Sequence, residues 1–165
     1  MSVTGEARRP AVVTAAATML AVGGMLFAGE TYLAEERFFK ASDIYGAVGE
    51  LANMFHRLVE ILGIFAGLAV ALLAAPAFLG LSWARAASWI FGLPMLIWYG
   101  LTASLSAFGR MVNGPDFTAV WPPWLDTLDT VLTATAAVLL VGALVGQTIP
   151  AADAYFRRRY REKVL

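Results

Sequence analysis

The sequence has no cysteine and a single histidine, His56, and only 15% of its 165 residues are charged. Without cysteine, the chain forms no disulfide, thiolate zinc site or iron–sulfur site and has no cysteine nucleophile. Bis-histidine haem ligation by this chain alone is excluded as well. Soluble domains carry about 25% charged residues. With 59% hydrophobic residues, the composition therefore argues against a soluble globular fold.

Recognisable catalytic motifs are also missing. The sequence has no phosphate-binding glycine loop, and no nucleophile stands at a known motif near the histidine. It has no Glu-x-x-His pair of the di-iron kind. We therefore expect no cofactor, and the sequence favours a protein that is not an enzyme.

Four long runs carry no formal charge: Pro10 to Gly29, Ile61 to Ala84, Ala86 to Gly109 and Thr130 to Ala152. A helix needs ~20 apolar residues to cross the ~30 Å hydrocarbon core of a bilayer. Each run meets that length. The sequence predicts one all-α transmembrane domain over residues 1–165, a four-helix bundle with spans at about 10–29, 58–80, 85–108 and 125–149.

The first run shares some features with a secretory signal, because Arg8 and Arg9 precede its apolar stretch. It is longer than the usual ~7 to 15 apolar residues of such signals. We expect it to be a retained first span.

The charges divide unequally between the two sides that four spans would create. The side holding both termini and Arg85 has eight basic and three acidic residues, and the other side has four basic and nine acidic. Basic residues near span ends stay on the cytoplasmic side. We expect a multi-pass protein of the bacterial inner membrane with both termini in the cytoplasm. The C-terminal basic cluster is interpreted as a topology anchor attracted to anionic lipid, because nucleic-acid binding would need a larger basic surface.

In the segment from Ser42 to Glu60, polar residues recur every three or four positions, and apolar residues occupy another face. This pattern predicts an amphipathic helix that leads into the second span at the outer interface. Ser42 or Asp43 is expected to cap its first turn.

Tryptophans stand near the predicted span ends, where indole rings settle at the membrane interface. Trp83 and Trp89 are expected at the inner boundary, and Trp121 and Trp124 at the outer one.

His56 and Glu60 form a compact ionisable cluster with Arg57 near the predicted membrane boundary. The spacing permits pairing within one helix, which is our first interpretation. A metal or proton-relay site is the alternative, with Glu50 and Glu30 as its further candidate ligands. The spacing of these four residues matches no known metal motif.

Two pairs of glycines have the small-xxx-small spacing that lets helices approach closely in lipid: Gly63 with Gly67, and Gly142 with Gly146. They support packing within the bundle or against a partner, and the sequence does not separate the two.

No predicted span carries a charge near its middle, where pumps and ion-coupled carriers place their ionisable residues. The sequence therefore predicts a non-catalytic accessory or structural subunit of a larger integral membrane complex for transport or energy conversion. Its expected partners are the lipid bilayer and other membrane subunits, with no nucleic acid. The alternative is a small membrane enzyme or metal-binding protein that uses His56 and Glu60 at the outer interface.

The layout resembles the small membrane subunit of TRAP (tripartite ATP-independent periplasmic) transporters. The resemblance is carried by residues 37–39, by the sequence Gly-Glu-Leu-Ala at 49–52, and by Trp-Pro-Pro-Trp at 121–124 before the last span. The chain departs from that family because Glu50 stands alone and the stretch 79–84 is apolar. The resemblance implies a scaffold that braces a larger carrier subunit.

Overall fold

The computed structural model describes residues 9–45, 50–113 and 123–164. Within these ranges the chain is helical and forms no strand. The helices are α1 (Ala11–Tyr45), α2 (Glu50–Phe78), α3 (Ser82–Asn113), α4 (Pro123–Gly146) and α5 (Pro150–Val164). The predicted all-α class is confirmed for this part of the chain.

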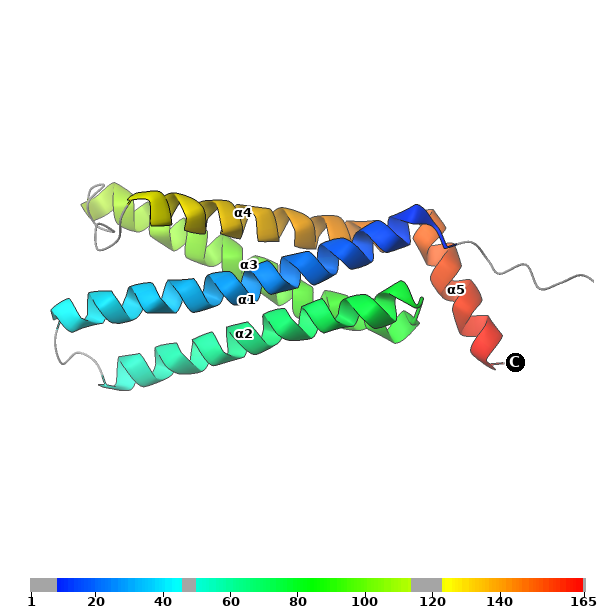
Figure 1. Ribbon diagram of the computed structural model, residues 1–165, viewed down its shortest axis with the longest axis horizontal. Coiled ribbons are helices and arrows are strands. Elements are labelled where there is room, and N and C mark those ends of the chain that lie inside the picture. The colour runs from blue at the N-terminus through cyan, green and yellow to red at the C-terminus, as the bar shows by residue number, and fades with distance from the viewer. Residues whose placement is uncertain (1–8, 46–49, 114–122, 165) are drawn as a thin grey trace, which may run out of the picture.

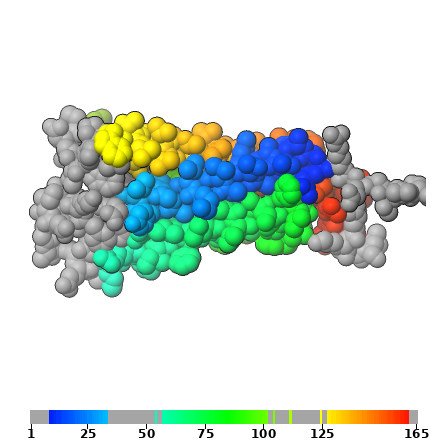
Figure 2. All heavy atoms as spheres, viewed as in Figure 1, coloured from blue at the N-terminus to red at the C-terminus, as the bar shows by residue number. Residues whose placement is uncertain are grey.

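Helices α1 to α4 run back and forth along one long axis (Figure 1). On the face shown in Figure 2, α1 lies between α2 and α4. It contacts both of them extensively, whereas α3 has less contact with α2 and α4. Helix α5 turns across the end of the bundle at which α1 begins (Figure 1). We call this the terminal end, and the end at which α4 begins the opposite end.

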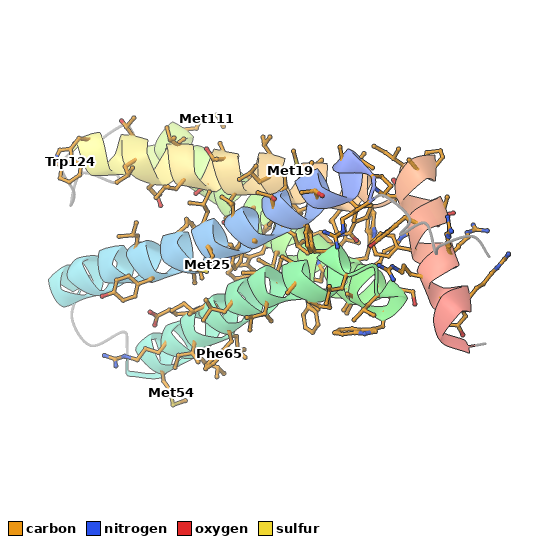
Figure 3. The ribbon with its side chains drawn as sticks, turned by 45° about the vertical axis from the view of Figure 1, so that its right-hand side comes forward. Met19, Met25, Met54, Phe65, Met111 and Trp124 are labelled. Atoms are coloured by element: carbon orange, nitrogen blue, oxygen red, sulfur yellow. The ribbon has the colours of Figure 1, made fainter. Side chains whose placement is uncertain are left out.

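Helix α1 is longer than its predicted span because no proline interrupts residues 11–45. Ser42 and Asp43 lie inside it, so the expectation that one of them caps the next helix is wrong. In the described chain, the amphipathic segment begins at Glu50 and continues without a break into α2. The apolar side chains of Met54 and Phe65 point outward from α2 (Figure 3).

Among the residues that the structure describes, three helices are long and apolar enough to cross a membrane, over Ala11–Leu33 in α1, Arg57–Phe78 in α2 and Thr127–Gly146 in α4. The chain is therefore a helical membrane protein. The described residues of α3, which holds the predicted third span, are not among these three.

Short turns reverse the chain at the terminal end. Gly80 lies between α2 and α3 with φ of 76°, which glycine adopts without steric cost. Its amide donates to Ala77 O, and the Leu81 amide donates to Pro76 O, both at 3.0 Å. These bonds close the end of α2 as in other glycine-terminated helices.

Helix α4 ends at Gly146, before the predicted end of the fourth span at residue 149. The carbonyl of Ile149 then accepts hydrogen bonds from the amides of Ala152 and Asp153 at 2.9 and 3.0 Å. Pro150 occupies the start of α5, where its missing amide hydrogen costs nothing. The chain thus bends at the terminal end, and its basic C-terminal segment forms a separate helix.

The core is built by all four long helices. Its buried residues are Leu20 and Phe27 from α1, Val70 and Ala74 from α2, Met95 and Tyr99 from α3, and Ala136, Leu140 and Ala143 from α4. The many alanines keep the helices close together. A second buried cluster of Val13, Ala152, Tyr155 and Phe156 packs α5 against the start of α1 at the terminal end.

Candidate functional site

The predicted metal candidates lie on two neighbouring helices. Glu50 and His56 belong to α2, but their side chains fall outside the described residues. Glu60 is half-buried on α2 and Glu30 half-buried on α1. No group of three or more metal-ligating side chains gathers in the described part of the chain. The metal site around His56 stays a prediction.

The four predicted packing glycines all face α1. A Cβ on Gly63 would lie 2.8 Å from Thr31 Cγ2, and one on Gly67 would lie 2.8 Å from the backbone oxygen of Gly24. Both positions bring α2 against α1.

The second pair does the same for α4. A Cβ on Gly142 would lie 2.9 Å from the sulfur of Met19, which sits on α1 beside α4 (Figure 3). A Cβ on Gly146 would lie 3.1 Å from the Cβ of Ala16. These glycines therefore contribute to helix packing within the bundle, where each brings its helix close to α1.

Gly23 and Gly24 complete this arrangement, although they are not among the predicted packing glycines. A Cβ on Gly24 would lie 2.6 Å from both Ala71 N and Gly67 O on α2, and one on Gly23 would meet Leu140 on α4 at 3.1 Å. Adjacent glycines point to different sides of a helix. Their adjacency was the signal that α1 approaches two neighbours at once.

The predicted interface tryptophans lie at both ends of the bundle. Trp83 is exposed and Trp89 half-buried at the start of α3. Trp124 is exposed at the start of α4, at the opposite end (Figure 3). Trp121 lies outside the described residues. The exposed Trp98 on α3 is a further indole that the sequence analysis did not single out.

A polar group also lies inside the bundle toward the opposite end. Tyr99 of α3 is buried, and its ring meets that of Phe27 edge-to-face with centroids 4.7 Å apart. The carboxylates of Glu30 and Asp129 are close enough to act on it electrostatically. The structure thus brings Glu30 of α1 near Tyr99 of α3.

The most developed polar arrangement lies at the terminal end, where α3 begins and α5 crosses it. Arg85 Nη1 donates to Asp153 Oδ1 at 2.5 Å, and Arg157 Nε donates to Asp153 Oδ2 at 2.7 Å. One carboxylate therefore joins two arginines. Asp153 also lies in the first turn of α5, where a negative charge is favourable.

These contacts lower the pKa of the Asp153 carboxyl. The hydrogen bond from Arg85 has the largest effect, and the positive charges of Arg157 and Arg85 act in the same direction against burial. The carboxylate is therefore ionised at neutral pH, and it holds both guanidinium groups in place.

Beside this ion pair lies a pocket of about 510 Å³. It is lined by Ser82, Arg85, Ala86 and Trp89 of α3 and by Phe156, Arg157, Tyr160 and Arg161 of α5. The volume is in the range of ~300 to 1,000 Å³ that is usual for small-ligand sites. Three arginines and three aromatic rings make the pocket suited to an anion that carries apolar groups.

A second set of contacts fixes the other side of α5. Arg9 lies over the ring of Phe78 at 3.5 Å from its centroid, and its Nε is 3.5 Å from the Tyr155 hydroxyl. Burial would raise the pKa of Tyr155, but the hydrogen bonds and charges of Arg9 and Arg159 outweigh burial and lower it. The segment before α1, the end of α2 and α5 thus meet at one point.

The C-terminal arginines form one cluster in the sequence, and the structure separates them by role. Arg157 and Arg161 line the pocket, whereas Arg159 lies near the Tyr155 ring. Arg85 was the one charge between the second and third uncharged runs. The charge count places Arg85 and Asp153 on the same side of the membrane, and this shared side was the signal for their pairing.

Comparison of the chain with protein-family models, curated proteins and solved structures finds no match in any of the three.

Proposed function

We propose that this protein is a non-catalytic accessory subunit of a larger integral membrane complex, and that α3 packs against a partner helix. In this proposal α3 is the fourth span, because residues 86–109 carry no charge and α3 runs beside α2 and α4. The partner is a membrane helix of another subunit in a transport or energy-converting assembly.

The observation that carries the proposal is the position of Gly100. It is exposed on α3, and a Cβ there would have no atom within 4 Å. Glycine costs about 1 kcal/mol relative to alanine inside a helix, and the bundle gains no contact from it. At Gly63, Gly67 and Gly142, in contrast, atoms of α1 lie close to the position that a Cβ would take.

The surroundings of Gly100 fit a helix interface in lipid. Ser104 is exposed one turn further along, which gives small-xxx-small spacing. On the N-terminal side of Gly100, Ile90, Leu93 and Ile97 are exposed at helical spacing. A partner helix could approach closely at the two small residues and contact the larger ones beyond them.

Purification of the full chain from its native membrane in mild detergent tests the proposal. We expect a larger integral membrane protein to co-purify, and Gly100→Ile to remove it without changing helix content. Gly29→Ile is the matched control, because Gly29 is also an exposed glycine with no atom within 4 Å of a Cβ but has no small residue four positions away. A monodisperse monomer with no co-purifying protein, or a dimer of this chain alone, would overturn the proposal.

The resemblance to the small subunit of TRAP transporters makes the proposal more specific. It implies that the co-purifying protein is a much larger carrier with many spans. Identification of that protein by mass spectrometry tests this version separately from the general one.

The proposed orientation places both termini in the cytoplasm of a bacterial cell. It is supported by the eight basic residues on the terminal side. Because the chain has no cysteine, single-cysteine variants report their side of the membrane cleanly. We expect a membrane-impermeant thiol reagent to label Trp124→Cys but not Arg158→Cys in intact cells, and the reverse pattern would contradict the orientation.

A further inference from the structure

We infer that the pocket between α3 and α5 binds the phosphate headgroup of an anionic phospholipid as a defined site. This inference does not depend on the partner proposed for α3. It rests on the charge and the position of the side chains that line the pocket, and on the order in which side chains follow one another along α3.

The pocket has an excess of positive charge. Arg85, Arg157 and Arg161 line it, and Asp153 shares its single carboxylate between the first two. These four residues carry a net charge of two positive. Guanidinium groups offer several hydrogen-bond donors in a plane that matches phosphate oxygens. The pocket is therefore suited to a phosphate, and most of all to a headgroup with more than one negative charge.

The ion pair also gives the site a fixed shape. Arg85 and Arg157 are held by separate oxygens of Asp153 at 2.5 and 2.7 Å. The guanidinium of Arg85 additionally lies 5.9 Å from the centroid of the Phe156 ring. Binding to arginines that are already held in place costs less side-chain entropy. This distinguishes the pocket from the mobile basic side chains of a general lipid-attracting surface.

The order of residues along α3 points to a phospholipid. Arg85, Trp89 and Leu93 are spaced four apart and therefore lie on nearly the same side of the helix. Trp89 lines the pocket and Leu93 is exposed beyond it. At 1.5 Å per residue, Leu93 lies about 12 Å further than Arg85 along the axis of α3, away from the terminal end. Charge, indole and aliphatic side chain thus follow the order of headgroup, glycerol region and acyl chain.

Basic pockets beside transmembrane helices are known to bind phosphorylated lipid headgroups. A water-soluble phosphate compound would use the arginines but not the apolar path from Trp89 to Leu93. We therefore assign the site to a membrane lipid, and the test includes a soluble phosphate as a separate probe.

The test uses the full chain in nanodiscs of phosphatidylcholine, with and without a small fraction of cardiolipin. Native mass spectrometry after release counts the retained lipids, and thermal unfolding gives the stabilisation by lipid. We expect one cardiolipin to be retained in preference to phosphatidylcholine, with a higher unfolding temperature. Equal retention of both lipids would overturn the inference.

Arg161→Gln tests the pocket without disturbing the pair of Arg85 with Asp153. Its matched control is Arg158→Gln, which removes the same charge from an exposed residue of α5 outside the pocket. We expect Arg161→Gln to weaken cardiolipin retention about fivefold more than the control does. Equal weakening by both variants would show diffuse attraction and would overturn a defined site.

Glycerol 3-phosphate serves as the soluble probe. If the acyl chain contributes, this compound should neither displace cardiolipin nor raise the unfolding temperature at the same concentration. Displacement as effective as that by a second anionic lipid would assign the pocket to a soluble phosphate compound and overturn the lipid assignment.

Discussion

Arg85 at the start of α3 and Asp153 at the start of α5 are joined by a 2.5 Å ion pair, although they are 68 residues apart in the chain. The pair links the terminal end of the bundle to the basic C-terminal helix. It also positions two of the three arginines of the pocket.

We expect Asp153→Asn to loosen α5 from the bundle. The neutral amide keeps the size of the side chain but no longer balances Arg85 and Arg157, so the two guanidinium groups repel each other. Hydrogen exchange should show faster exchange of α5 amides with little change in the core of α1. Unchanged protection of α5 would contradict a role for the pair in docking this helix.

The same pair gives the docking of α5 a pH dependence. The pKa of Asp153 is lower in the folded protein than in an unfolded chain, chiefly because of the hydrogen bond from Arg85. Its contribution to stability is therefore present above the unfolded value of about 3.9 and is lost as the pH falls through the folded value. Protection of α5 measured from pH 7 downward should decline in acid. Asp153→Asn should remove this decline.

Gly24→Ala is expected to destabilise the bundle by about 1 to 3 kcal/mol, because overpacking forces helices apart. The added Cβ would lie 2.6 Å from backbone atoms of α2, which do not move away as a flexible side chain does. Gly29→Ala on the same helix is the control, since a Cβ there meets no atom within 4 Å. Thermal unfolding in detergent should separate the two variants, and equal stability would contradict the close approach of α1 and α2.

Gly80→Ala should destabilise the terminal end for two reasons. The positive φ of Gly80 costs other residues about 1 to 2 kcal/mol. The new Cβ would also lie 2.6 Å from Cε1 of Tyr155. We expect a lower unfolding temperature together with faster hydrogen exchange in α5. Loss of stability without any change in α5 would indicate that only the backbone strain matters.

Gln147→Leu is expected to stabilise the protein. The side chain is 1% exposed, and in the described part of the chain neither of its amide atoms has a hydrogen-bond partner. An unpaired buried polar group costs about 1 to 3 kcal/mol, which an apolar side chain of similar size avoids. Chemical unfolding should show a higher free energy of unfolding. Gln147→Glu should have the opposite effect, because it would bury a charge.

Much of the fold was predictable because hydrocarbon imposes a simple rule. Backbone groups must pair within a helix there, so a long uncharged run predicts a helix. The runs beginning at Pro10, Ile61 and Thr130 correspond to the three helices that are apolar enough to span a membrane in the described part of the chain. The ends of helices were less predictable: Ser42 and Asp43 extend α1, and α4 ends at Gly146.

The sequence by itself determined that this is a helical membrane protein with its basic residues concentrated beside the two termini, since length and charge set these properties locally. Only the tertiary structure decided which surfaces each residue meets. It packed Gly67 and Gly142 against α1, left Gly100 uncovered on α3, and folded α5 back so that Asp153 reaches Arg85. The physical reason is that small and charged side chains act through what lies opposite them, and their neighbours come from distant parts of the chain.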